Sequence, residues 1–147
     1  MKFMVQSSKF RVIVFLLLLV AHCSLLITKV HASQDNWGKV AFEIEKALNQ
    51  AVDTYEKGKN IEAMELVADA YFGIFEGEKA NMEIAVRRFI NLKKSSELEK
   101  GFADLRRAIK EGIKPADFKK QALSLIEAVK AAAKELDRKG VKLSSEF

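Results

Sequence analysis

The chain has 147 residues, with 25 Lys and Arg against 20 Asp and Glu, and a single cysteine. This length suffices for one domain whose core needs no disulfide. Four of the basic residues and none of the acidic ones precede Ser33, so residues 33–147 carry a net charge of only +1. The basic character of the chain therefore comes mainly from its N-terminal segment, and it gives no reason to expect a nucleic-acid partner.

The N-terminal segment is typical of a secretory signal peptide. Residues 1–11 carry three basic residues and no acid, residues 12–27 form an apolar run, and residues 30–32 are Val-His-Ala, a pattern that signal peptidases cleave. The run falls short of the roughly 20 apolar residues that a spanning helix needs, which favours cleavage over a permanent anchor. We predict a signal peptide over residues 1–32 and a periplasmic or secreted domain over residues 33–147. Contact with the membrane is expected only through the signal peptide, if it stays uncleaved.

Cleavage at this position removes Cys23 and both histidines, His22 and His31. The remaining domain has no thiol nucleophile, no histidine base and no Cys or His ligand, so we expect neither zinc nor haem. A metal would have to bind through carboxylate, phenol, thioether or backbone oxygen, a set that suits hard ions such as ferric iron, calcium, magnesium or manganese. The sequence also lacks a Gly-rich phosphate loop, a Gly-x-Ser-x-Gly motif and a His-Glu-x-x-His motif. We therefore expect no enzymatic activity.

The domain shows a helical period of apolar residues throughout. The first helix is expected over about residues 36–57 and ends at Gly58, and Trp37 is expected to close one end of the core. The second runs from an N-cap at Asn60 to about Glu76, with Ile61, Phe72 and Phe75 among its buried residues.

After Gly77 the period resumes near Asn81 and continues to Gly112, with an interruption at Ser95 and Ser96. Ser96 and Glu99 have the spacing of a capping box that would start a new helix or a kinked continuation. The last helix begins near Pro115 and ends before Gly140. Four helices with one apolar face each predict an all-α fold, an antiparallel four-helix bundle whose third element is either continuous or split in two.

Carboxylates gather beside the apolar stripe of the second helix. At about 100° per residue, Glu62, Glu65, Asp69 and Glu76 fall within a narrow arc. Like charges in this arrangement indicate basic neighbours on another helix or a bound cation, and ordinary solvated or salt-bridged carboxylates are the simpler alternative. Several basic residues could form a patch or a solvated helix face: Arg87, Arg88, Lys93, Lys94, Arg106 and Arg107.

The runs AYFGIFEG and NMEIAV, followed by SELEKGFADLRRAI, resemble the extracytoplasmic helical domain of the bacterial high-affinity iron permease family. The resemblance covers about residues 67–140 and implies a protein of the cell envelope that takes part in iron acquisition. The matching positions are Tyr71, Phe72, Phe75, Glu76, Glu83, Leu98, Glu99, Phe102 and Leu105. Of these, Glu76 and Glu83 are the expected metal ligands, while Phe72, Phe75, Phe102 and Leu105 are expected to pack in the core. Asp69, Tyr71 and Glu78 flank the same helix break and could complete the site.

The permeases continue into several membrane helices with Arg-Glu-x-x-Glu pairs, and this chain has neither. Transport itself is therefore not expected of it, and the chain is either a free-standing relative of the accessory domain or a truncated product of a longer gene. We expect a helical accessory protein that binds iron through carboxylates, next to a membrane iron transporter. The alternative is a metal-independent interaction module of the envelope that docks a transporter or a second copy of itself.

Overall fold

The structure, a computed structural model, describes residues 36–77 and 80–143. The chain divides into two units, Met1–Gln34 and Asp35–Phe147, and all described residues belong to the second unit. The predicted signal peptide lies outside the described residues. Every regular element in the described part is a helix, as predicted, and none of these helices has the length and hydropathy needed to cross a membrane.

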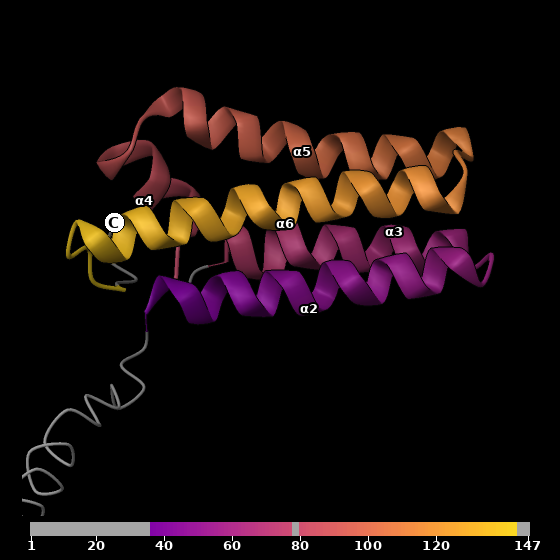
Figure 1. Cartoon of the computed structure of the whole chain (residues 1–147), viewed down its shortest axis with the longest axis horizontal. Coiled ribbons are helices and arrows are strands. Elements are labelled where there is room, and N and C mark those ends of the chain that lie inside the picture. Colours follow the sequence, from indigo (N-terminus) through magenta and orange to yellow (C-terminus); the bar gives the residue numbers. More distant parts are fainter. Residues whose placement is uncertain (1–35, 78–79, 144–147) are drawn as a thin grey trace, which may run out of the picture. The chain divides into compact units, whose positions relative to one another are not determined.

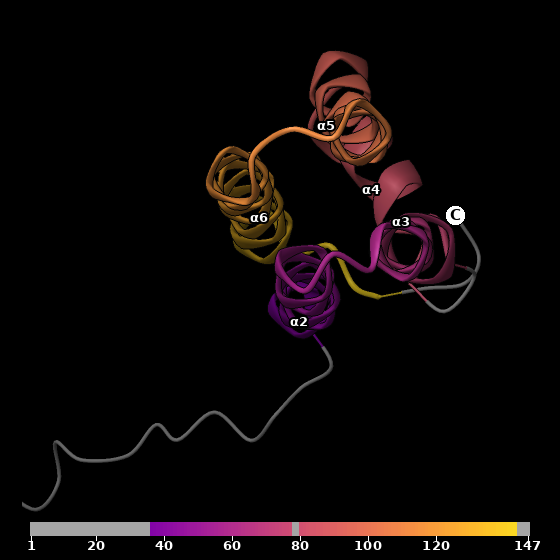
Figure 2. The ribbon, with the colours of Figure 1, turned by 90° about the vertical axis from the view of Figure 1, so that its right-hand side faces the viewer.

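The described helices are α2 (Trp37–Glu56), α3 (Asn60–Ala68), the π-helix η1 (Asp69–Phe75), α4 (Met82–Phe89), α5 (Leu92–Glu111) and α6 (Pro115–Arg138). The chain passes from α3 into η1 without a break. Figure 1 shows α2, α3, α5 and α6 lying along one direction, with the chain reversing from each to the next. Viewed from the end in Figure 2, α2 lies between α3 and α6, and the short α4 lies between α3 and α5.

Asparagine side chains cap the start of two helices, and glycines follow the end of three. The side chain of Asn36 accepts a hydrogen bond from Lys39 N at 3.1 Å, and Asn91 accepts one from Lys94 N at 2.7 Å, so each asparagine caps the first turn of its helix. Glycines with positive φ follow three helix ends, as expected: Gly58 after α2, Gly112 after α5 and Gly140 after α6.

Two predicted helix starts are wrong. Asn60 is the first residue of α3, and no side chain caps that helix. Ser96 and Glu99 do not begin a helix either, because they lie inside α5, which starts at Leu92. The break in the third predicted element falls earlier than expected, between the end of α4 and Asn91.

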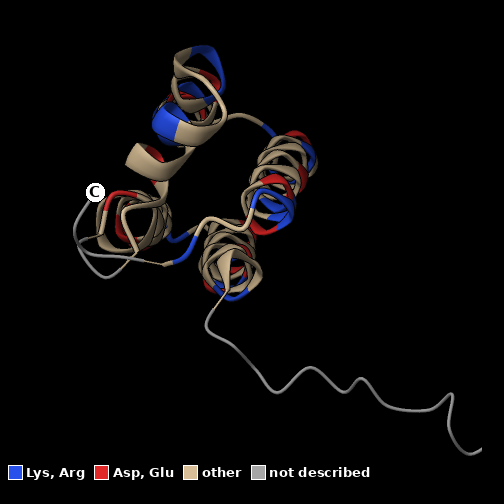
Figure 3. Cartoon of the chain, turned by 90° about the vertical axis from the view of Figure 1, so that its left-hand side faces the viewer, with Lys and Arg blue, Asp and Glu red and all other residues tan. Residues whose placement is uncertain are grey.

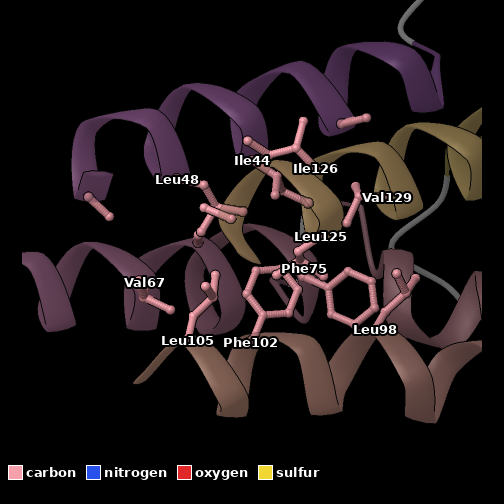
Figure 4. Close-up of a cluster of buried hydrophobic side chains, with 14 of the residues drawn as sticks. Ile44, Leu48, Val67, Phe75, Leu98, Phe102, Leu105, Leu125, Ile126 and Val129 are labelled. Atoms are coloured by element: carbon pink, nitrogen blue, oxygen red, sulfur yellow. The ribbon is translucent and has the colours of Figure 1, made fainter. Parts of the chain in front are cut away.

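One cluster of buried apolar side chains, to which every helix contributes, forms the core. Figure 4 shows Phe75 and Phe102 at its centre, with Leu105 and Leu98 on opposite sides of the two rings and Ile44 and Leu48 above them. The two phenylalanine ring centroids are 5.4 Å apart. Phe75, Phe102 and Leu105 are buried, as predicted. The prediction that Ile61 and Phe72 are buried is wrong, since 72% and 55% of their surfaces are exposed.

Hydrogen bonds join the start of α2 to the end of α6, and the end of α2 to the segment just before α6. Trp37 is fully buried, as predicted, and its Nε1 donates to Val141 O at 2.7 Å. Its backbone N–H donates to Asp137 Oδ1 at 3.0 Å, so a carboxylate from the end of α6 caps the first turn of α2. At the opposite end, Tyr55 Oη donates to Ile113 O at 2.7 Å, just before α6. These contacts fix α2 against α6, its most extensive neighbour.

Candidate functional site

A π-helix forms the last turns of the second predicted helix, just before the predicted break at Gly77. Across it the backbone bonds span five residues, and Glu76 N donates to Tyr71 O at 2.8 Å. Gly77 permits this closure, because a Cβ atom there would lie 2.2 Å from the carbonyl oxygen of Gly73. Segments of π-helix are rare and occur often at functional sites, so this local geometry marks the region for attention.

The π-helix brings Tyr71 and Glu76 together. Tyr71 Oη donates a hydrogen bond to Glu76 Oε1 at 2.7 Å. The tyrosine ring packs against Phe102 of α5 with centroids 5.3 Å apart, and against Phe75 at 6.0 Å. The Tyr71 side chain is therefore held at both ends, because aromatic residues pack against its ring and the Glu76 carboxylate accepts a hydrogen bond from its hydroxyl.

A second pair of side chains, both carboxylates, meets where the start of α4 packs against α5. Asn81, in the left-handed region at φ 50°, leads into the first turn of α4, which carries Glu83. Ser95 of α5 is fully buried, and its Oγ donates to Glu99 Oε1 at 2.9 Å. The same Oγ lies 3.4 Å from Glu83 O and 3.5 Å from Glu83 Oε1, so one hydroxyl contacts both acidic residues.

Arg87 is the counter-charge of this pair. Its Nη2 forms an ion pair and hydrogen bond with Glu83 Oε1, four residues earlier on α4. The same nitrogen lies 3.7 Å from Glu99 Oε1. Half of the arginine side chain is exposed, whereas only 12% of the Glu83 side chain is, so the cation reaches in from solvent to a largely buried carboxylate.

The two pairs act on each other electrostatically. Burial raises the pKa of Glu83, the charges of Glu99 and Glu76 and a hydrogen bond with Glu99 raise it further, and only Arg87 lowers it. Burial also raises the pKa of Tyr71, together with its hydrogen bond to Glu76 and the charges of Glu76, Glu99 and Glu83. Four oxygen-bearing side chains thus form one site, which we name the tyrosine–glutamate cluster: Tyr71, Glu76, Glu83 and Glu99.

The structure brings three of the five predicted ligands into this cluster, namely Tyr71, Glu76 and Glu83. Asp69 is exposed at the start of η1. The angular rule that placed it beside Glu76 assumed an α-helix, and it does not hold across a π-helix. Glu78 lies outside the described residues.

Carboxylates and a phenol are the ligands that hard cations prefer. Nevertheless, among residues 36–77 and 80–143 no three Asp, Glu, His or Cys side chains are already arranged to hold a metal ion. In the arrangement described, the carboxylates of the cluster accept hydrogen bonds from the hydroxyls of Tyr71 and Ser95, and Arg87 pairs with Glu83 and Glu99. A cation would have to replace Arg87 and draw the carboxylates inward.

Sequence reasoning missed the roles of Ser95, Arg87 and Glu99 in this site. It assigned Ser95 to a helix interruption, Arg87 to a basic patch and Glu99 to a capping box. A usable signal was present, because Glu83 and Arg87 are four residues apart, as are Ser95 and Glu99, and side chains at this spacing are neighbours on a helix.

Comparison of the chain with models of protein families, with curated proteins and with solved structures finds no match.

Proposed function

We propose that this chain is an exported accessory protein of iron acquisition that binds a hard cation, iron in the first place, at the tyrosine–glutamate cluster. One observation supports the proposal: η1, α4 and α5 bring a phenol and three glutamates into one partly buried site, where burial and the charges of neighbouring glutamates raise the pKa values of Tyr71 and Glu83. Carboxylates crowded in this way are destabilising unless they are protonated, paired or bound to a cation. The resemblance of residues 67–140 to the extracytoplasmic domain of iron permeases supports iron as that cation.

The proposed protein is periplasmic or secreted, with a signal peptide over residues 1–32. Its proposed architecture is an antiparallel four-helix bundle over residues 33–147, in which α3 with η1 forms the second member and α4 is the separated start of the third. The cluster would then lie where the second and third members are broken. Such a position allows the ligands to move on binding while the long helices stay in place.

Binding of the metal ion would displace the guanidinium of Arg87 from the carboxylates. The three carboxylates and Arg87 together carry a net charge of −2 when all are ionised, so the site attracts a multivalent ion. The exposed half of Arg87 gives it a path into solvent. Because Glu83 and Tyr71 hold their protons more tightly than usual, cation binding would release protons and would weaken as the pH falls.

A titration of the purified protein with ferrous iron and with ferric citrate, read by native mass spectrometry, tests the proposal. The test variant is Glu76→Gln with Glu83→Gln, and the matched control is Glu62→Gln with Glu65→Gln, which changes two exposed acids on α3. We expect stoichiometric binding in the wild type and the control and none in the test variant, with unchanged helical circular dichroism. Equal binding by all three proteins would remove the site assignment.

A metal-independent interaction module is the second candidate function. It is favoured by the finding that the described residues contain no ready set of three ligands and that Arg87 already pairs with both Glu83 and Glu99. Absence of any stoichiometric metal, together with recovery of a membrane iron transporter by crosslinking, would support this function over the first.

A further inference from the structure

The fully buried residues of α3 and η1 follow a helical spacing that changes once. Ala63, Val67 and Ala70 are four and three residues apart, as on one face of an α-helix. An α-helix would next bury Ile74, four residues after Ala70, yet Ile74 is only partly buried and Phe75 is fully buried instead. The spacing of five is the extra residue that the π-helix η1 takes into its turn.

The same segment has a second way to fill the core. We name the observed arrangement, with Phe75 inside, the π register, and the α-helical arrangement of residues 69–75, with Ile74 inside, the α register. Ile74 and Phe75 are both large apolar residues, so either one supplies a buried side chain after Ala70. Gly73, in the middle of η1, weakens the segment in both registers, since glycine is costly inside a helix.

Only the π register assembles the tyrosine–glutamate cluster. In it Tyr71 Oη donates to Glu76 Oε1 at 2.7 Å. In the α register these two side chains would point about 140° away from each other, so Glu76 would leave the site. Glu83 and Glu99 belong to α4 and α5, outside the segment that changes. The register of η1 therefore decides whether the site has three carboxylates or two.

Gly77 favours the π register at its exit. A Cβ atom on Gly77 would lie 2.2 Å from the carbonyl oxygen of Gly73, so a larger residue opposes the arrangement observed. In an α-helix, residue 77 is the ordinary hydrogen-bond partner of residue 73, and alanine fits there. Figure 3 views the helices from the end at which the chain leaves η1 for α4.

We propose that η1 is a two-register switch of the cation site: the π register completes the tyrosine–glutamate cluster and holds the ion, and the α register withdraws Glu76 and releases it. The switch rests on the proposed binding of a cation at this cluster. An ion that contacts both Tyr71 and Glu76 binds the π register more tightly, so it shifts the population of η1 toward that register. By linkage, a change that disfavours the π register weakens binding of the ion.

Hydrogen exchange of the metal-free protein, read by mass spectrometry on peptides that span residues 69–77, tests for the two registers. A change of register breaks the backbone hydrogen bonds of η1, so these peptides should exchange faster than those from the middle of α2. Ile74→Thr should slow the exchange roughly tenfold, because a hydroxyl is tolerated at the partly exposed place but is unpaired in the buried one. Leu66→Thr, at a partly buried position of α3 outside η1, is the matched control and should not slow it.

Titration with ferric citrate, read by native mass spectrometry, tests the coupling to the ion. Gly77→Ala keeps all four side chains of the cluster, yet it should weaken iron binding roughly tenfold, a factor typical of coupled equilibria. Gly38→Ala, near the start of α2, is the matched control and should keep the wild-type affinity. Iron should also slow the exchange of residues 69–77 in the wild type.

Each part of the proposal has a result that would overturn it. If residues 69–77 of the metal-free wild type exchange as slowly as α2 and Ile74→Thr has no effect, the segment has one register and the switch is wrong. If wild type and Gly77→Ala bind iron equally well, the cation site stands and the coupling is wrong. A wild type that binds no iron would overturn the proposed function and the coupling together, and exchange without metal would still show whether two registers exist.

Discussion

The hydroxyl of Tyr71 donates a hydrogen bond of 2.7 Å to the carboxylate of Glu76, five residues further along the chain. On an α-helix, side chains five residues apart point about 140° away from each other and do not meet. The π-helix of residues 69–75 removes this mismatch, because its bonds join residues five apart. The π-helix is therefore what allows Tyr71 and Glu76, two members of the tyrosine–glutamate cluster, to meet.

Replacement of Tyr71 by phenylalanine should lower the free energy of unfolding by about 1–2 kcal/mol, since it leaves a partly buried carboxylate without its donor. Urea unfolding measures this loss. The matched variant is Tyr55→Phe, which also loses one hydroxyl bond, the one to Ile113 O. Both should be destabilised to a similar degree, but only Tyr71→Phe should also change iron binding. Loss of iron binding in Tyr55→Phe would contradict a specific role for the Tyr71 phenol.

Glu83 should make stability fall as the pH rises from the ordinary glutamate pKa of about 4.3 through the raised pKa of this carboxyl in the folded protein. Burial and the charges of Glu99 and Glu76 raise its pKa in the folded protein above the ordinary value of about 4.3. The folded state then binds the proton more tightly than the unfolded state, so its contribution is fully present below the unfolded pKa and is lost as the pH rises through the folded pKa.

Urea unfolding at a series of pH values should therefore show a smaller slope for Glu83→Gln than for the wild type. Glu97→Gln, a change on the exposed part of α5, serves as the control and should keep the wild-type slope. An identical pH dependence in the Glu83 variant would show that this carboxyl titrates as it does in the unfolded chain.

Arg87→Gln should lower stability modestly at neutral pH, by about 0.2–1 kcal/mol, because half of this side chain is exposed to solvent. The same change should strengthen cation binding roughly tenfold, since it removes a positive charge that competes for Glu83 and Glu99. Arg107→Gln, which breaks an ion pair with Asp104 away from the cluster, should leave the affinity unchanged. Weaker binding in Arg87→Gln would mean that the arginine does not occupy the place of the ion.

The buried faces of the long helices could be predicted because a regular α-helix repeats its side-chain directions. Ile44, Phe102 and Ile126 are buried as the period predicts. The same rule failed for Phe72, since it lies within η1, where the register changes and the ring turns to solvent. Phe75, only three residues later, returns to the core.

The cluster could be predicted only in part, because its members come from three helices. Tyr71, Glu76 and Glu83 stand near one helix break in the sequence and could be grouped on that basis. Glu99 joins them only through the packing of α5 against η1 and α4, which no local pattern contains. The sequence predicts an interruption at Ser95, whereas in the structure this side chain is buried inside α5 and its hydroxyl donates to Glu99 one turn later.

Two glycines shape the π-helix and its exit: Gly73 lies within η1, and Gly77 lies two residues after its end. Gly77→Ala should lower the free energy of unfolding by about 1–3 kcal/mol, because its Cβ atom would lie 2.2 Å from the backbone oxygen of Gly73 and the turn would have to open. Gly73→Ala is the matched control. Apart from the backbone of its own helix and its chain neighbours, no atom lies within 4 Å of a Cβ placed there, so the effect on the free energy of unfolding should stay within about 1 kcal/mol. Fluorescence of Trp37, the single and fully buried tryptophan, reports unfolding in both variants. If the two alanine variants were equally stable, Gly77 would not be what holds the π-helix closed, and Tyr71 and Glu76 would owe their pairing to contacts elsewhere.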